Sequence, residues 1–192
     1  DYFLGFEVVQ KIRVLQIARD AEADEATSIT KVCTSNKVSI EVDNRMALPD
    51  EAELQNYDLI ISNGLNSPSN GYSNSLKAFA EAGGAVLVIP DIVEINPRAE
   101  LLMSSLGFGD DFHWVTSEDM VIAAGLNVEN PHFNGVFSST PSKMDLPKSM
   151  YALSYRSKAE VQRLGSNWNG EHLLARTEIG RGIGFLLGMP LS

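Results

Sequence analysis

Residues 57–91 read YDLIISNGLNSPSNGYSNSLKAFAEAGGAVLVIPD and predict a strand, a loop, a helix and a second strand. The first apolar run, 58–62, is too short for a helix and is rich in β-branched isoleucine. After a loop of Gly, Ser, Pro and Asn, apolar residues recur with the spacing of one helix face, at Tyr72, Leu76, Phe79 and Ala80. The glycines at 83 and 84 end this helix before the second apolar run, 85–89.

Both runs are apolar at consecutive positions, which is typical of strands in a parallel sheet that is covered on both faces. A strand, a crossover helix and a parallel strand form a right-handed unit in nearly all proteins. We therefore predict that 58–62 and 85–89 are parallel neighbours near the centre of a sheet. The helix from Tyr72 should cover one face of that sheet.

The flanking sequence extends this unit in both directions. Before it lie predicted strands at 12–17 and 38–42, the second with the alternation of a half-exposed edge strand. Helical patterns follow at 26–33, at 49–55 and from Asn96-Pro97 onward, where proline suits the first helical position. Alternating strands and helices predict an open, doubly wound α/β sheet.

The pattern changes in the second half of the chain. Residues 108–148 carry weak signals, and we interpret them as an irregular segment with one or two strands. Short apolar runs then follow without an intervening helix and predict antiparallel strands and hairpins, at 151–155, 161–164, 172–177 and 183–189. We predict one α/β domain over 1–192, with a mainly parallel sheet, helices on both faces and C-terminal antiparallel additions.

The charge of the chain excludes several classes of partner. The net charge is −10 and the pI is about 4.7. Nucleic-acid binding and docking on anionic lipid both need clustered Lys and Arg, so neither is expected. No apolar run approaches the roughly 18 residues of a membrane-spanning helix.

Residues that often carry chemistry have simpler interpretations here. Cys33, the only cysteine, lies on the apolar face of a predicted helix and is expected in the core rather than as a nucleophile. His113, His132 and His172 are too far apart for the close-spaced ligand pairs of a zinc site. The glycine-rich stretch 180–184 precedes an apolar strand, which favours a hairpin turn over a phosphate loop. We predict no catalytic constellation, no metal and no cofactor.

Four polar residues lie just beyond the carboxyl ends of the two central strands. They are Asn63, Asn66, Asp91 and Glu94. Ligands of open α/β sheets bind at this edge, where the connections between strands diverge. The alternative is that these loops are polar only because water surrounds them. We predict a candidate ligand-binding site here and no catalytic residue.

The phrase YDLIISNG (57–64) resembles the strand before the glycine-rich loop of the class I glutamine amidotransferase-like superfamily, which has a flavodoxin-like sheet. In active members, the strand that matches 85–89 leads into a glycine-flanked cysteine at a sharp elbow, and a late strand leads into His-Pro-Glu. This chain has PDIV (90–93) and MPL (189–191) at those places. The resemblance therefore implies the fold without the catalytic triad.

A narrower resemblance rests on NPHFNGVF (130–137), on Leu146-Pro147 with Tyr151, and on residues 180–191. These stretches look like the large domain of bacterial membrane proteins related to the aerotolerance-operon group. The resemblance implies a domain of a longer, membrane-anchored protein. It also implies a location on the extracytoplasmic, periplasmic face of the inner membrane, with other envelope or membrane proteins as partners.

Two classes of function remain open. The first is a non-catalytic binding or scaffolding domain in an envelope complex. The second is a hydrolase that uses the carboxylates of Asp91 and Glu94 in place of the lost triad. We expect no glutaminase or cysteine-hydrolase activity, because thiolate chemistry needs a nucleophile, a base and donors for the oxyanion.

Overall fold

The computed structural model describes residues 11–19, 30–31, 39–65, 67–91, 95–133, 148–167 and 170–190. In this part of the chain, nine strands form a sheet in the order β2-β1-β3-β4-β9-β8-β7-β5-β6. The strands are β1 (Lys11–Ala18), β2 (Ser39–Arg45), β3 (Leu59–Asn63), β4 (Ala85–Ile89), β5 (Gly109–Leu126), β6 (Lys148–Ser157), β7 (Gln162–Asn167), β8 (His172–Ile179) and β9 (Gly182–Leu187). The helices are α2 (Glu51–Leu54), α3 (Asn70–Glu81), α4 (Pro97–Ser105) and the short η1 (Pro131–Phe133).

The first four strands form the predicted parallel part of the sheet. β1 pairs in parallel with β2 on one side and with β3 on the other, and β3 pairs in parallel with β4. The register of β3 and β4 runs from Leu59 opposite Ala85 to Asn63 opposite Ile89. The predicted α/β class is therefore confirmed, as are the parallel pairing of the two central runs and the edge position of β2.

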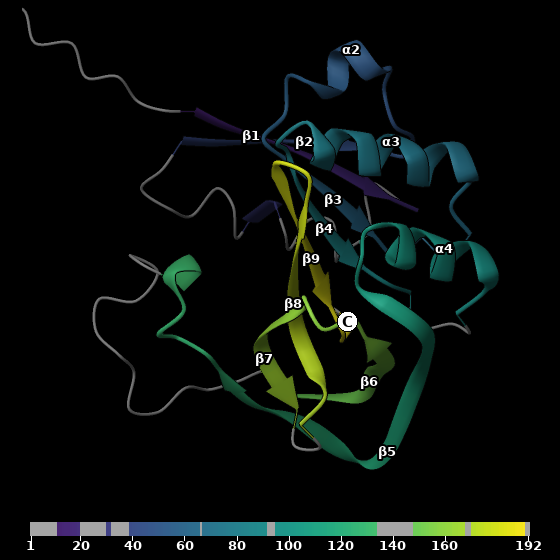
Figure 1. Cartoon of the computed structure of the whole chain (residues 1–192), viewed down its shortest axis with the longest axis vertical. Coiled ribbons are helices and arrows are strands. Elements are labelled where there is room, and N and C mark those ends of the chain that lie inside the picture. Colours follow the sequence, from purple (N-terminus) through teal and green to yellow (C-terminus); the bar gives the residue numbers. More distant parts are fainter. Residues whose placement is uncertain are drawn as a thin grey trace, which may run out of the picture.

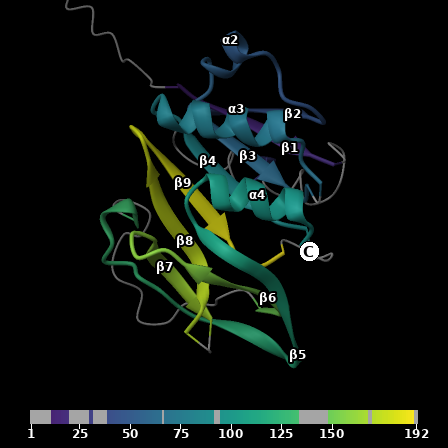
Figure 2. The same ribbon diagram turned by 45° about the vertical axis from the view of Figure 1, so that its right-hand side comes forward.

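Helices α3 and α4 lie across the same face of the sheet (Figure 1, Figure 2). Helix α3 begins after Ser69, whose hydroxyl accepts a hydrogen bond from the backbone N–H of Tyr72 at 3.1 Å. Helix α4 begins after Asn96, whose side chain accepts from two backbone N–H groups, with proline at the first helical position. No helix within the described residues is long and apolar enough to cross a bilayer.

The strands of the parallel part send alternate side chains to two different faces. Leu15 and Ile17 of β1 pack into the main core beneath α3 and α4. Val14 of β1 packs with Ile61 and Ile89 in a second apolar cluster on the opposite face. Each face of the sheet therefore has its own core.

The helix predicted on the second face falls almost wholly outside the described residues. Of 26–33, only Thr30 and Lys31 are described, and both are helical. Thr30 lies against the second face, because its hydroxyl accepts a hydrogen bond from Asn44 Nδ2 of β2 at 3.2 Å. Cys33 lies outside the described residues, so its predicted place in the core stays a prediction.

The segment expected to be irregular contains one long strand, β5. Its first part pairs antiparallel with β6 and its last part with β7. The register of β5 shifts between Asp110 and His113 and again between Thr116 and Val121. One or two strands were predicted in this segment, and such irregularities break the two-residue alternation on which a strand is recognised, which explains why the length of β5 was not predicted.

Strand β9 corrects the expectation of purely antiparallel C-terminal strands. It forms the predicted hairpin with β8, and the glycine-rich stretch at 180 is the turn of that hairpin. On its other side β9 pairs in parallel with β4, from Ala85 opposite Ile183 to Val88 opposite Leu186. β9 therefore joins the parallel and antiparallel parts of one sheet.

Glycine at 182 is required by the close approach of the β8–β9 hairpin to helix α3. A Cβ atom on Gly182 would overlap the carbonyl oxygens of Ala80 and Gly84. Both oxygens belong to backbone and cannot move aside without shifting α3 or the start of β4.

We predict that Gly182→Ala destabilises the protein by about 1–3 kcal/mol, the usual cost of overpacking a filled site. Gly71→Ala is the matched control, because it lies in helix α3 and its nearest neighbour is 3.8 Å from the added carbon. The control should stabilise the protein by about 0.5–1 kcal/mol, since alanine favours a helix more than glycine does. Urea denaturation of both variants provides the measurement, and equal stability of the two would contradict this account of position 182.

Candidate functional site

The candidate site lies where the carboxyl ends of β1, β3 and β4 meet. Because β2 pairs with the far side of β1, the connections that leave β1 and β3 run in opposite directions along the sheet. Ligands of open α/β sheets bind at such a point. The register places Ala18 of β1 opposite Asn63 of β3, and Asn63 opposite Ile89 of β4.

The structure brings two of the four predicted site residues to this edge. Asn63 ends β3 and is 5% exposed, and its side chain makes no hydrogen bond within the described part of the chain. Asp91 follows β4, and its carboxylate oxygen lies 3.4 Å from Nη1 of Arg19. Its backbone oxygen accepts a hydrogen bond from Trp114 Nε1 at 2.8 Å. Asn66 and Glu94 lie outside the described residues.

A fully buried glutamine lies two register pairs further from the edge. Gln16 of β1 is 0% exposed, and neither its Nε2 nor its Oε1 has a hydrogen-bond partner. Its register neighbours are Asn44 of β2 and Ile61 of β3. The Oδ1 atom of Asn44 is also buried without a partner. Gln16, Asn44 and Asn63 all lie on the second face of the sheet, and we call them the amide cluster.

These unpaired groups are costly for the folded protein. A buried donor or acceptor without a partner costs about 1–3 kcal/mol. Native proteins pair nearly all such groups, so each exception calls for an explanation. The sequence contains a signal for this residue, because Gln16 interrupts the otherwise apolar end of the run IRVLQI.

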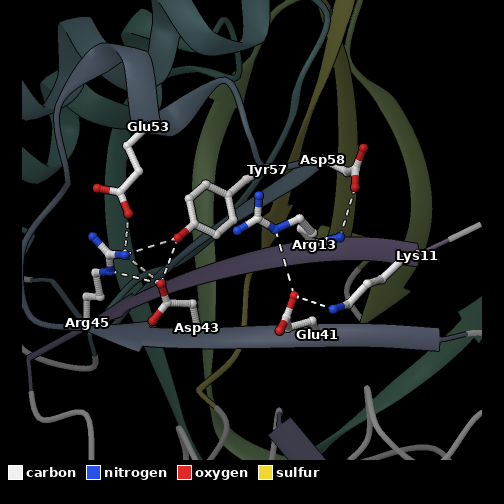
Figure 3. Close-up of polar contacts among 8 residues, drawn as sticks. All are labelled: Lys11, Arg13, Glu41, Asp43, Arg45, Glu53, Tyr57 and Asp58. Carbon is white, nitrogen blue, oxygen red and sulfur yellow. Dashed lines mark hydrogen bonds and ion pairs between the residues drawn. The ribbon is translucent and has the colours of Figure 1, made fainter.

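Charged side chains of β1 and β2 lie on the opposite face, in a separate network (Figure 3). Lys11 Nζ lies 2.8 Å from the carboxylate of Glu41. The hydroxyl of Tyr57 donates to Asp43 Oδ2 at 2.6 Å, and Arg45 contacts the same carboxylate at 2.8 Å. Charged residues on an edge strand protect it from pairing with other chains, which is a sufficient role for this network.

This network changes the pKa values of its members. The hydrogen bond from Tyr57 is the main cause that holds the pKa of the Asp43 carboxyl below its usual value, and Arg45 adds to it. Burial, followed by the bond to Asp43, raises the pKa of the Tyr57 phenol. Arg13 lies over the Tyr57 ring with its guanidinium carbon 5.2 Å from the ring centroid.

A hollow of about 610 Å³ lies at the other edge of the sheet, near the amino ends of β4 and β9. Its charged residues already have structural roles. Arg181 Nη2 donates to the carbonyl of Ala82 at 2.8 Å, at the end of α3. Asp58 Oδ2 accepts from the backbone N–H of Arg13 at 2.8 Å. The two charged groups of this hollow are therefore engaged with backbone.

Two of the three histidines have described surroundings. His113 is exposed, and its Nδ1 contacts the backbone oxygen of Asp111 at 3.0 Å. His172 packs against Tyr155 with ring centroids 5.5 Å apart, and burial lowers the pKa of its imidazole. Across the described residues, no three His, Cys, Asp or Glu side chains gather as metal ligands would.

Comparisons with known proteins identify related folds. No family model matches the chain, and no curated protein matches it in sequence. Among solved structures, the chain is similar to the cytoplasmic protein STM3548 of Salmonella typhimurium, at 18% identity and a TM-score of 0.67, over 94% of this chain and 88% of that one. STM1381 of Salmonella typhimurium LT2 matches at 15% identity and a TM-score of 0.66, over 95% and 89%.

The same fold also occurs within much longer enzymes. The chain matches a cold-adapted β-galactosidase from Rahnella sp. R3 at 15% identity and a TM-score of 0.62, over 94% of this chain but only 29% of that one. At these identities the similarity shows a shared fold, and it assigns no activity to this chain.

The comparison corrects the predicted location. We expected a domain on the periplasmic face of the inner membrane, whereas the two Salmonella structures are described as cytoplasmic proteins. The prediction of a periplasmic location is therefore wrong. The membrane anchor and the envelope partners that depended on it lose their support.

We predict that Gln16→Met stabilises the protein by about 1–3 kcal/mol, because it removes an unpaired buried amide and keeps an unbranched side chain of similar length. Gln55→Met is the matched control at an exposed position, where the change should stay within about 0.5 kcal/mol. Chemical denaturation measures both. If Gln16→Met destabilises the protein and Gln55→Met does not, the side-chain amide of Gln16 has hydrogen-bond partners in solution.

We also predict that Tyr57→Phe makes stability less dependent on acid pH. The lowered pKa of Asp43 contributes stability above the ordinary carboxyl pKa, and this contribution is lost as pH falls through the lowered value. Without the phenol, the pKa of Asp43 moves back toward its usual value, so less stability remains to be lost on acidification. Urea denaturation from about pH 7 to about pH 3 measures the difference.

Tyr151→Phe is the control for this change, because the Tyr151 hydroxyl has no carboxylate partner among the described residues. Its pH dependence should match that of wild type. If Tyr57→Phe behaves in the same way as this control, the bond to Asp43 does not contribute in solution.

Proposed function

We propose that this chain is a non-catalytic binding domain whose ligand is held at the carboxyl edge of β1 and β3. One observation carries the proposal: the side-chain amide of Gln16 is fully buried, and both of its polar atoms are unpaired. A bound ligand that pairs these atoms would recover the free energy that the unpaired amide costs.

The residues around Gln16 favour the interpretation that its unpaired amide belongs to a binding site and is not a packing defect. Asn44 of β2, whose Oδ1 is unpaired, is its register neighbour, and Asn63 lies two register pairs nearer the edge. Three amide side chains thus lie near the point where the strand order reverses, and two of them, Gln16 and Asn44, carry buried polar atoms without partners. That is the place at which open α/β sheets bind their ligands.

We also propose that the fold is flavodoxin-like, of the glutamine amidotransferase-like kind. Strands β2, β1, β3, β4 and β9 follow one another in the order 2-1-3-4-5 of that arrangement, counting β9 as the fifth parallel strand. At the place of the lost catalytic pair, Met189 is 7% exposed and packs against Leu173. An apolar contact there supports binding rather than catalysis.

The hydrolase alternative receives no such support. One of its two carboxylates, Asp91, already contacts Arg19 Nη1 at 3.4 Å. The second carboxylate that it requires, Glu94, lies outside the described residues. We therefore place Asp91 at the entrance of a binding site, where it contacts Arg19 directly after the end of β1.

A ligand-stabilisation screen tests the proposed function. A ligand that binds only the folded protein raises its unfolding temperature by mass action. At least one compound of a varied metabolite set should stabilise wild type and Gln55→Met, but not Gln16→Met. A compound whose effect survives Gln16→Met unchanged would place binding elsewhere.

The stability of Gln16→Met tests the proposed function in a second way. If Gln16→Met is less stable than wild type and no compound binds, the glutamine is a structural residue and the proposed function is wrong.

A further inference from the structure

The amide cluster also restricts the chemistry of its ligand, and this restriction rests on the proposed function. The side chain of Gln16 presents two N–H donors and one carbonyl acceptor in a single plane, all without partners. Its N–H and C=O lie side by side on one edge of that plane. The complementary group offers an acceptor and a donor at the same spacing, also in one plane. Asn44 Oδ1 adds one more acceptor next to this edge.

The electrostatic surroundings favour an uncharged ligand. Glu41, Asp43 and Arg45 of β2 alternate with Asn44 and therefore face the opposite side of the sheet (Figure 3). At the edge, Arg19 and Asp91 pair with each other. Among the described side chains of β1, β2 and β3 on this face, an ion beside Gln16 would find no counter-charge, and burying an unpaired ion is far more costly than burying a neutral polar group. Carboxylates, phosphates and ammonium groups are poor ligands for the cluster.

The side chains around Gln16 favour a flat ligand. On the same face it is flanked by Val14 and Ile61, each 2% exposed, which present apolar surfaces. Ala18 lies between Gln16 and the edge of the sheet, and its methyl side chain takes up little space there. Sugars would bring several hydroxyl groups against these apolar surfaces and leave them unpaired.

We infer that the ligand is an uncharged planar heterocycle with a hydrogen-bond donor and acceptor side by side, as on the edge of a nucleobase, and that it bonds to the amide of Gln16. Glutamine and asparagine amides form two parallel hydrogen bonds with such an edge. The ligand is a free small molecule, because the charge of −10 opposes a nucleic-acid strand. Ala18 and Asn63, each 5% exposed, lie between the amide of Gln16 and the carboxyl edge of the sheet.

Calorimetric titration with uracil, adenine and hypoxanthine tests this inference, with glucose, glycine and inorganic phosphate as probes of the excluded classes. The proteins are wild type, Gln16→Met, Ala18→Leu and the control Gln55→Met. Gln16→Met removes the paired donor and acceptor, whereas Ala18→Leu keeps all the amides and blocks the approach to them. Thermal unfolding and circular dichroism establish that each variant is folded.

We expect at least one heterocycle to bind wild type and Gln55→Met equally. Gln16→Met should raise its Kd by roughly 5- to 150-fold, which corresponds to the loss of one bidentate pair. Ala18→Leu should weaken binding as well, although no hydrogen-bonding group is removed. Glucose, glycine and phosphate should produce no heat that depends on Gln16.

Three results would overturn the inference. If glucose, glycine or phosphate binds in a Gln16-dependent way and no heterocycle does, the ligand class is wrong while the proposed function stands. If a heterocycle binds equally well to wild type and Gln16→Met, it occupies a different site. If no heterocycle binds wild type at millimolar concentration, the inferred class is wrong, and the stability of Gln16→Met decides the proposed function.

Discussion

The contact between the β8–β9 hairpin and the end of helix α3 holds the two parts of the sheet together. Arg181 donates its backbone N–H to Glu81 and its guanidinium to Ala82, both carbonyls of the last turn of α3 or its cap. Ile183 donates to the carbonyl of Gly84 at 3.2 Å. These bonds fix the start of β9 beside β4. The union of the two parts depends on that pairing, because β9 is the strand that lies between β4 and β8.

The parallel part of the sheet could be predicted because the sequence patterns that specify it lie within the individual strands and helices. Each strand of this part is either an apolar run or, in β2, an alternating run of suitable length, and Ser69 and Asn96 provide standard helix caps. The pairing of β9 with β4 could not be read in the same way. It joins residues that are almost one hundred positions apart, and no local pattern specifies which distant strand becomes a neighbour. The length of β5 was not predicted for a different reason. Its irregular register breaks the two-residue alternation by which a strand is recognised.

In the candidate site, too, some residues could be predicted from local sequence patterns, whereas others depend on contacts between distant parts of the chain. The fold rule placed Asn63 and Asp91 at the carboxyl edge, and both are found there. Gln16 and Asn44 were missed because a polar side chain in a strand becomes important only when it is buried, and burial depends on what packs over it. The two-residue alternation of β2 does indicate that Asn44 and its charged neighbours point to opposite faces. What it cannot indicate is that the amides lack partners.

The late position of β9 in the chain has a consequence for protein synthesis. Until residues 182–187 leave the ribosome, β4 is an edge strand with its backbone N–H and C=O groups unpaired on one side. Its sequence AVLVI is apolar and β-branched, which is the composition that associates with other exposed edges. The unfinished chain is therefore more prone to aggregation than the complete one. Dependence on chaperones during translation should end when the β8–β9 hairpin docks against α3.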